Sequence, residues 1–341
     1  MSGFHSNYLE TRLGLFAARL IGTRKLISFI DLEPERLLAE VNRLSAQDYT
    51  LDGANSQSVE AQLTDSALAD FQVLLRPFSG SERRFFYFAI RWFELVNLKV
   101  LIRGKFSGID NAVIRQHLVD IGGFADLPID KLLEADDPYE MLRLLETTAY
   151  AGIVRHSRRV YEEQGNDLFL LDATIDRSFF IGLYQRLDYL RKQDGAALRK
   201  VLGSLLDRFN LIWLLRYRFS YGLSAAKSFY LLSAIGKRLH STELMQLALL
   251  DSIEEVIAEL PEPYQTLLSN LRQIPDMEAA MEFYALSIAA QTLRRGDNLV
   301  ARVFSYILLR EAELRFLQAL IKGKQLGLDD ELIKRGLGAA A

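Results

Sequence analysis

The sequence contains no cysteine, which excludes disulfide bonds and cysteine-ligated metal sites. Its histidines are scattered, and no two of them have the spacing of a zinc-binding helix. They are His5, His117, His156 and His240. The glycine-rich loop of nucleotide-binding proteins and the Gly-x-Ser-x-Gly elbow of hydrolases are also missing. We therefore expect no cofactor, no metal ion and no catalytic site in this chain.

Proline and long apolar runs are scarce. Only 7 of 341 residues are proline, so long stretches carry no helix breaker. No run reaches the about eighteen apolar residues that a membrane-spanning helix needs, because arginines such as Arg91 and Arg216 interrupt the richest stretches. Residues 1–7 lack the pattern of a signal peptide. We expect any membrane association to depend on a partner.

Charge is nearly balanced over the whole chain but not locally. The net charge of −3 argues against a nucleic-acid partner. Basic residues dominate 76–105 and 199–238, whereas acidic residues dominate 251–262. These segments are either solvated helix faces or patches that orient docking onto charged partners.

Apolar residues recur every three or four positions through most of the chain, which is the period of an α-helix. A clear example is the stripe formed by Phe85, Phe88, Ala89, Trp92, Val96 and Val100. Gly104 and Gly108 follow it, as glycine often follows the last turn of a helix. No alternating run is long enough to predict a sheet. The fold class that we expect is all-α.

A helix-end pattern recurs along the chain. Glu94, Asn97-Leu98, Arg103 and Lys105 reappear 113 positions later as Asp207, Asn210-Leu211, Arg216 and Arg218. A looser third copy ends at Lys322-Gly323-Lys324, and in it Glu313 stands where the asparagine stood. We expect the two asparagines to form hydrogen bonds across helices. A repeat of about 110 residues predicts three similar helical domains, at 1–109, 110–223 and 224–341.

The repeat residues also carry a family resemblance. They are Asn97-Leu98-Lys99 with Arg103-Gly104-Lys105, Asn210-Leu211 with Arg216, the segment from Asp172 to Phe180, and Ser233 to Leu239. In order and spacing, over nearly the whole chain, they resemble the C-type subunits of the V/A-type rotary ATPases, which are called d-type in eukaryotes. Ile212 and Glu313 depart from the pattern of the first copy.

The resemblance implies a funnel of three helical domains about a pseudo-threefold axis. In that family the wide mouth seats the central rotor shaft, which is built from D- and F-type subunits. The base of the funnel rests on the proteolipid rotor ring in the membrane. A member of this family is cytoplasmic and peripheral to the membrane. It transmits torque between ATP turnover and H⁺ or Na⁺ transport and performs no chemistry.

Two other functions stay open at this point: a helical-repeat scaffold of another complex, and an all-α enzyme with a site at a domain junction. The candidate partner-interface residues are the cations that end the repeated helices. They are Arg103, Lys105, Arg216, Arg218, Lys322 and Lys324. On a pseudo-threefold funnel they fall around one rim. The alternative is that they only cap their own helices, an interaction of about 0.3–1 kcal/mol each.

Overall fold

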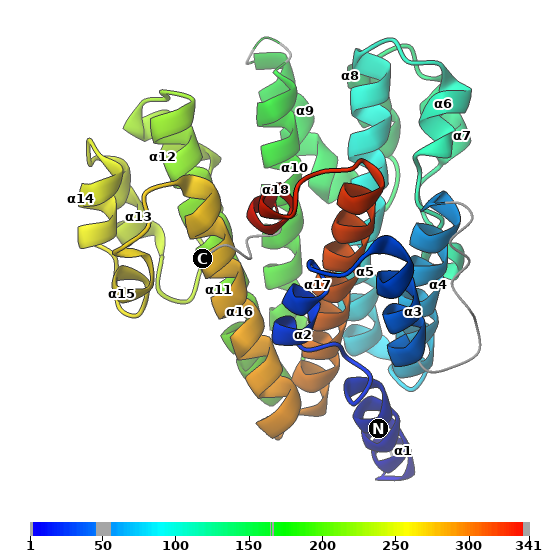
Figure 1. The fold of residues 1–341 in the computed structure, drawn as a ribbon. Helices are drawn as coiled ribbons and strands as arrows, with labels where there is room; N and C mark the ends of the chain where they lie inside the picture. Colours follow the sequence, from blue (N-terminus) through cyan, green and yellow to red (C-terminus); the bar gives the residue numbers. More distant parts are fainter. Residues whose placement is uncertain (1–2, 46–55, 164, 166, 337–341) are drawn as a thin grey trace.

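A computed structural model describes residues 3–45, 56–163, 165 and 167–336. All regular structure in these ranges is helical, and they contain no strand (Figure 1). The all-α prediction is therefore confirmed. The apolar period and the scarcity of proline explain why helices form, because both favour uninterrupted backbone hydrogen bonding along the chain.

Six long helices dominate the fold and follow one another as three antiparallel pairs (Figure 1). The pairs are α4 (Ser56–Leu75) with α5 (Gly80–Phe106), α10 (Leu168–Gln185) with α11 (Lys192–Leu215), and α16 (Ile274–Arg295) with α17 (Leu299–Gln325). Side chains cap two of these helices: Asp167 accepts from the N–H of Phe169 at 2.8 Å, and Asn298 accepts from that of Ala301 at 2.9 Å. Each cap satisfies an N–H group that the first helical turn leaves unpaired.

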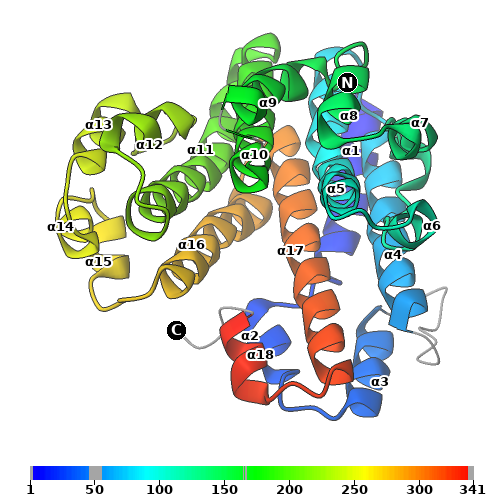
Figure 2. The same cartoon turned by 90° about the horizontal axis from the view of Figure 1, so that it is seen from above.

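Shorter helices gather in three groups around the ends of α5, α11 and α17 (Figure 2). They are α2 (Thr23–Ser28), α3 (Pro34–Ser45), α6 (Asn111–Gln116), α7 (Ile129–Glu134), α8 (Pro138–Leu145), α12 (Ala225–Leu231), α13 (Ser241–Ala248), α14 (Ile253–Ala258), α15 (Tyr264–Leu268) and α18 (Asp330–Gly336). The remaining elements are α1 (Gly3–Ala17), α9 (Ala151–Glu163), the 3-10 turns η1 (Gly122–Phe124) and η2 (Arg186–Tyr189), and the π-helical turn η3 (Arg216–Ser220).

The three pairs are joined in a closed circuit. Helix α10 packs against α5, α16 packs against α11, and α4 packs against α17. The first helix of each pair thus contacts the second helix of another pair. The last contact returns from the third pair to the first, and Figure 2 shows this arrangement of the long helices from above.

The hydrophobic core agrees only in part with the stripe predicted on α5. Phe85 and Phe88 are buried, but Val96 is 44% exposed, whereas Leu98 and Leu101 are buried. The reason is that α5 is covered on more than one side, by α10 and η2 along its length and by α6, α7 and α8 near its end. A helix enclosed in this way has no single apolar face.

Candidate functional site

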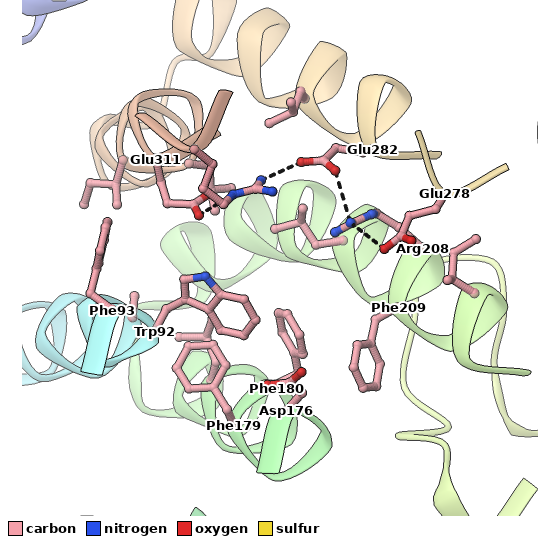
Figure 3. A pocket seen from close by; sticks show the side chains of 18 of the residues that line it. Trp92, Phe93, Asp176, Phe179, Phe180, Arg208, Phe209, Glu278, Glu282 and Glu311 are labelled. Carbon is pink, nitrogen blue, oxygen red and sulfur yellow. Dashed lines mark hydrogen bonds and ion pairs between the residues drawn. The ribbon is translucent and has the colours of Figure 1, made fainter. Parts of the chain in front are cut away.

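A central cavity of about 320 Å³ opens between α5, α10, α11, α16 and α17. Aromatic side chains supply much of its wall, and six of them are Trp92, Phe93, Phe179, Phe180, Phe209 and Trp213 (Figure 3). The Phe180 ring centroid lies 5.5 Å from that of Trp92 and 5.0 Å from that of Phe209. Aromatic rings offer large apolar contact areas. The cavity is therefore suited to holding an apolar group.

One wall of the cavity is a chain of ion pairs across three helices (Figure 3). Arg208 on α11 lies 3.2 Å from Glu278 and 3.1 Å from Glu282 on α16. Arg315 on α17 lies 2.5 Å from Glu282 and 2.6 Å from Glu311. Burial raises the pKa of the Glu282 carboxyl, but Arg208 and Arg315 outweigh burial and hold that pKa below its ordinary value. These charges compensate one another and fasten α11, α16 and α17 together.

A single ion pair joins α5 to α10 at the cavity lining. Lys99 Nζ lies 2.5 Å from Asp176 Oδ1, and the two side chains are only 17% and 12% exposed. Burial raises the pKa of the Asp176 carboxyl, although the Lys99 ammonium acts in the opposite direction. This pair connects the first helix pair to the second.

The two repeated asparagines bind loop backbones rather than another helix, which corrects the expectation from the sequence. Asn97 donates to the carbonyl of Val119 at 2.7 Å and accepts from the N–H of the same residue at 2.8 Å. Asn210 donates to the carbonyl of Ile235 at 2.8 Å. In both cases the chain beyond the long helix folds back along that helix, and its backbone groups need partners.

The acid three residues before each asparagine holds the same returning loop, a role that the sequence pattern alone did not assign. Glu94 accepts two consecutive backbone N–H groups at 2.5 and 2.7 Å. Asp207 accepts the backbone N–H groups of Lys237–Leu239 and the hydroxyl of Tyr264, which lies 2.6 Å away. The signal in the sequence is an acid at the same position of both repeats.

The third copy follows the first in a different register from the one predicted. Glu313 is 2% exposed and accepts the backbone N–H of Ile21 at 2.5 Å. It therefore corresponds to the loop-binding Glu94 and not to Asn97. In this register Lys322 follows Glu313 at the same sequence separation as Arg103 follows Glu94, so Lys322 and Lys324 correspond to Arg103 and Lys105.

The candidate interface cations lie where α5, α11 and α17 end, and four of them have partners within the chain. Arg103 forms an ion pair with Asp172 on α10. Arg216 forms one with Glu278 on α16 at 2.6 Å. Both pairs cross from one helix pair to the next.

The other candidate cations differ in their surroundings. Arg218 donates to the carbonyls of Leu223 and Leu250, each at 3.0 Å. Lys324 donates to Asp330 at 2.6 Å. Lys105 is half-buried and Lys322 is exposed, and neither forms an ion pair with a side chain in the described part of the chain.

Two kinds of site are missing from the residues that the structure describes. No group of three or more histidine, aspartate or glutamate side chains among them has an arrangement that holds a metal ion. None of the helices in the same ranges combines the length and apolarity needed to cross a bilayer.

Comparison with known proteins gives one consistent result. The family model described as ATP synthase (C/AC39) subunit matches residues 29–336. The chain is 27% identical to the C subunit of the A-type ATP synthase of Haloferax volcanii, over 98% of each chain. It is 31% identical to that of Halorubrum lacusprofundi, over 73% of this chain and 72% of the relative. For Methanocaldococcus jannaschii the identity is 25%, over 96% of this chain and 84% of the relative.

Proposed function

Because the chain belongs to the C/AC39 family of ATP synthase subunits and is a non-catalytic member of that complex, we propose that it joins the central rotor shaft to the membrane rotor ring of an A-type ATP synthase. In this role it transmits torque between ATP turnover and H⁺ or Na⁺ transport. Its position is peripheral, on the cytoplasmic side of the membrane. The alternative of an all-α enzyme is set aside by the family.

The proposal includes a three-domain organisation. The boundaries expected at residues 109 and 223 leave each long helix pair whole, with α4–α5, α10–α11 and α16–α17 in successive domains. Support comes from the closed circuit of contacts between the pairs and from the loop-binding acids Glu94, Asp207 and Glu313. Three similar units arranged about an axis place the ends of α5, α11 and α17 around one opening, the mouth of the proposed funnel.

The observation that carries the proposal is the aromatic cavity enclosed by the long helices (Figure 3). We assign it to the tip of the D/F-type shaft, which enters from the side where α5, α11 and α17 end. The opposite side, at the connections 76–79, 186–191 and 296–298, faces the proteolipid ring. Apolar burial supplies the attraction at the seat, while the ion pairs around it keep its shape.

The cations at the mouth have a second, smaller part in the proposal. Arg103, Arg216, Arg218 and Lys324 are engaged within the chain, so Lys105 and Lys322 are the stronger candidates for guiding a charged partner toward the cavity. A charge at the rim of an interface acts mainly on the rate of association.

The test is binding of the shaft to two matched variants. Trp213→Glu places a charge on the wall of the cavity, and Trp213 is only half-buried, so the variant should fold. It should bind the shaft at least about tenfold more weakly, because a desolvated charge opposes apolar contact. Tyr189→Glu alters a side chain that is 75% exposed on the opposite side. It should keep shaft binding and weaken reconstitution with ring-containing membranes.

Full shaft affinity in folded Trp213→Glu protein contradicts the assigned seat. If neither variant changes assembly with the shaft or the ring, the proposed position between the shaft and the ring is wrong. Circular dichroism of both variants establishes that the comparison is made between folded proteins.

A further inference from the structure

The ends of α5 and α17 align without a gap at an offset of 219 positions. The identical pairs include Glu94 and Glu313, Gly104 and Gly323, Lys105 and Lys324, Gly108 and Gly327, Asp110 and Asp329, and Ile114 and Ile333. This match covers the last turns of the long helix, the turn that follows and the next short helix. It is closer than the match of either segment to the second copy, in which the π-helical turn η3 accommodates one extra residue.

The two ends also pack in the same way. A Cβ atom placed on Gly104 would lie 2.5 Å from Ile114 Cγ1, and one placed on Gly323 would lie 3.0 Å from Ile333 Cγ1. Helix α6 thus crosses α5 at a glycine, and α18 crosses α17 at the equivalent glycine. The structural equivalence therefore extends through α6 in the first unit and through α18 in the third.

In the first unit, the chain after α6 forms the loop that Glu94 binds, and then α7 and α8. In the second, the chain after α12 forms the loop that Asp207 binds, and then α13 and α14. In the third, the described residues after α17 supply only α18. The backbone N–H that Glu313 accepts comes instead from Ile21, near the other end of the sequence.

Residues 18–45, which we call the strap, reproduce the missing order of elements. The backbone bound by Glu313 comes first, then the six-residue helix α2, and then α3, which begins at Pro34. In the first unit the bound loop precedes the six-residue α7 and then α8, which begins at Pro138. Both α2 and α3 pack against α17, as α7 and α8 pack against α5.

In both units an ion pair also joins the short helix after the long one to the segment around the next short helix. Arg115 on α6 lies 2.5 Å from Asp130 on α7, and Lys334 on α18 lies 3.7 Å from Asp31, which follows α2. Arg115 and Lys334 occupy equivalent positions at the offset of 219. Among the described residues of the third unit, α1 has no counterpart in the first unit.

We propose that the strap is the missing part of the third unit, so that this unit is built from both ends of the chain and the strap closes the ring. The inference rests on the three-unit organisation proposed above, and it moves residues 18–45 out of the first domain. A consequence concerns a second cavity of about 770 Å³. Leu20, Ile21 and Leu26 of the strap line it together with α16 and α17. The strap therefore forms one wall of this cavity.

Hydrogen exchange on the full-length chain tests the assignment. Glu313→Ala removes the acceptor of the Ile21 amide, and exchange across α2 and α3 should become roughly tenfold faster because a buried charged acceptor is lost. Glu313→Gln, which keeps an acceptor oxygen, should restore part of the protection. The matched variant Glu94→Ala should have the same effect on the loop before α7 and leave the strap unchanged.

Unchanged exchange in the strap of Glu313→Ala, with loss of protection confined to α16–α18, overturns the proposal. A circular permutant gives a second measurement. Its native ends are joined by a flexible linker, and its new ends lie between His117 and Leu118, the equivalent place in the first unit. It should keep the helix content of the parent, and hydrogen exchange should become slower in the strap and faster in residues 119–145. A permutant that folds but shows the parent's exchange rates in both segments refutes the equivalence. Neither readout involves the shaft, so failure of the proposed function does not affect them.

Discussion

Asp207 offers the sharpest test of how the returning loops are held. It is fully buried on α11, and its carboxylate accepts the backbone N–H groups of Lys237, Arg238 and Leu239 at 2.8, 3.0 and 3.1 Å. The Tyr264 hydroxyl donates at 2.6 Å. Asp207→Asn keeps the shape of the side chain, but it removes the charge and turns an NH₂ group toward donors.

The expected cost follows from these donors. A hydrogen bond to a charged group contributes about 1.5–3 kcal/mol, against about 1 kcal/mol for a neutral one. Four donors facing a neutral, partly mismatched amide should lower the free energy of unfolding by about 3 kcal/mol. Asp207→Ala leaves every donor unpaired and should cost about 5 kcal/mol, which is a large share of the about 5–15 kcal/mol that stabilises a typical protein. Asp207→Asn is therefore the more informative variant.

Urea unfolding followed by far-ultraviolet circular dichroism measures the effect as a lower midpoint at constant slope. The matched control is Asp188→Asn, because Asp188 is 67% exposed and pairs with Arg199 at 2.5 Å. Surface pairs of this kind contribute about 0.2–1 kcal/mol. If the two asparagine variants lose similar stability, the reasoning that makes Asp207 an anchor is wrong.

Three further predictions concern other parts of the molecule. Replacing Gly104 or Gly323 with alanine places a methyl group 2.5 or 3.0 Å, respectively, from an isoleucine of the next helix. Each variant should lower the free energy of unfolding by about 1–3 kcal/mol, and the loss should be larger at Gly104. If urea unfolding gives both variants the stability of the parent, this packing is wrong. Asp176 has a raised pKa in the folded protein, so its contribution to stability is greatest in acid and is lost as pH rises through that pKa. Asp176→Asn should therefore reduce the decline of the melting temperature with rising pH. An unchanged pH profile would exclude the Asp176 carboxyl as the cause of that decline. Lys105→Glu should leave the melting temperature nearly constant and slow the association with the shaft. Added salt, which should slow association of the parent protein, should not slow association of the variant. A fall in melting temperature with unchanged association kinetics would make Lys105 structural.

The sequence predicts the helices well because their period is a local property. It also locates Glu94 and Asp207 in a repeat, but their partners lie about 30 residues further on in loops, and no local pattern gives that pairing. Glu313 is harder still, because its partner Ile21 lies at the other end of the chain. Its correct register emerges only when the contacts are compared.

The cavity could not be predicted for a different reason. Trp92, Phe180 and Trp213 have the helical spacing of ordinary core residues, and only the arrangement of five helices turns them toward a shared space. Arg103 and Arg216 illustrate the same limit. Their position at helix ends is visible in the sequence, but the acids that pair with them lie 60 to 70 residues further along the chain, on α10 and α16.

The closed circuit of long helices has a mechanical meaning. Torque applied to a ring of packed helices is resisted as shear, because each helix opposes the sliding of its neighbour. Packed side chains resist sliding because the ridges of one helix sit in the grooves of the next, and each junction here also carries a charged pair. The nitrogen–oxygen distances are 2.5 Å for Lys99–Asp176, 3.2 Å for Arg208–Glu278 and 3.8 Å for Arg310–Asp70. A slip of one helical turn, about 5.4 Å, would break all three pairs together and leave charges of low exposure unpaired. If the chain transmits torque as proposed above, these pairs oppose slippage by a full helical turn.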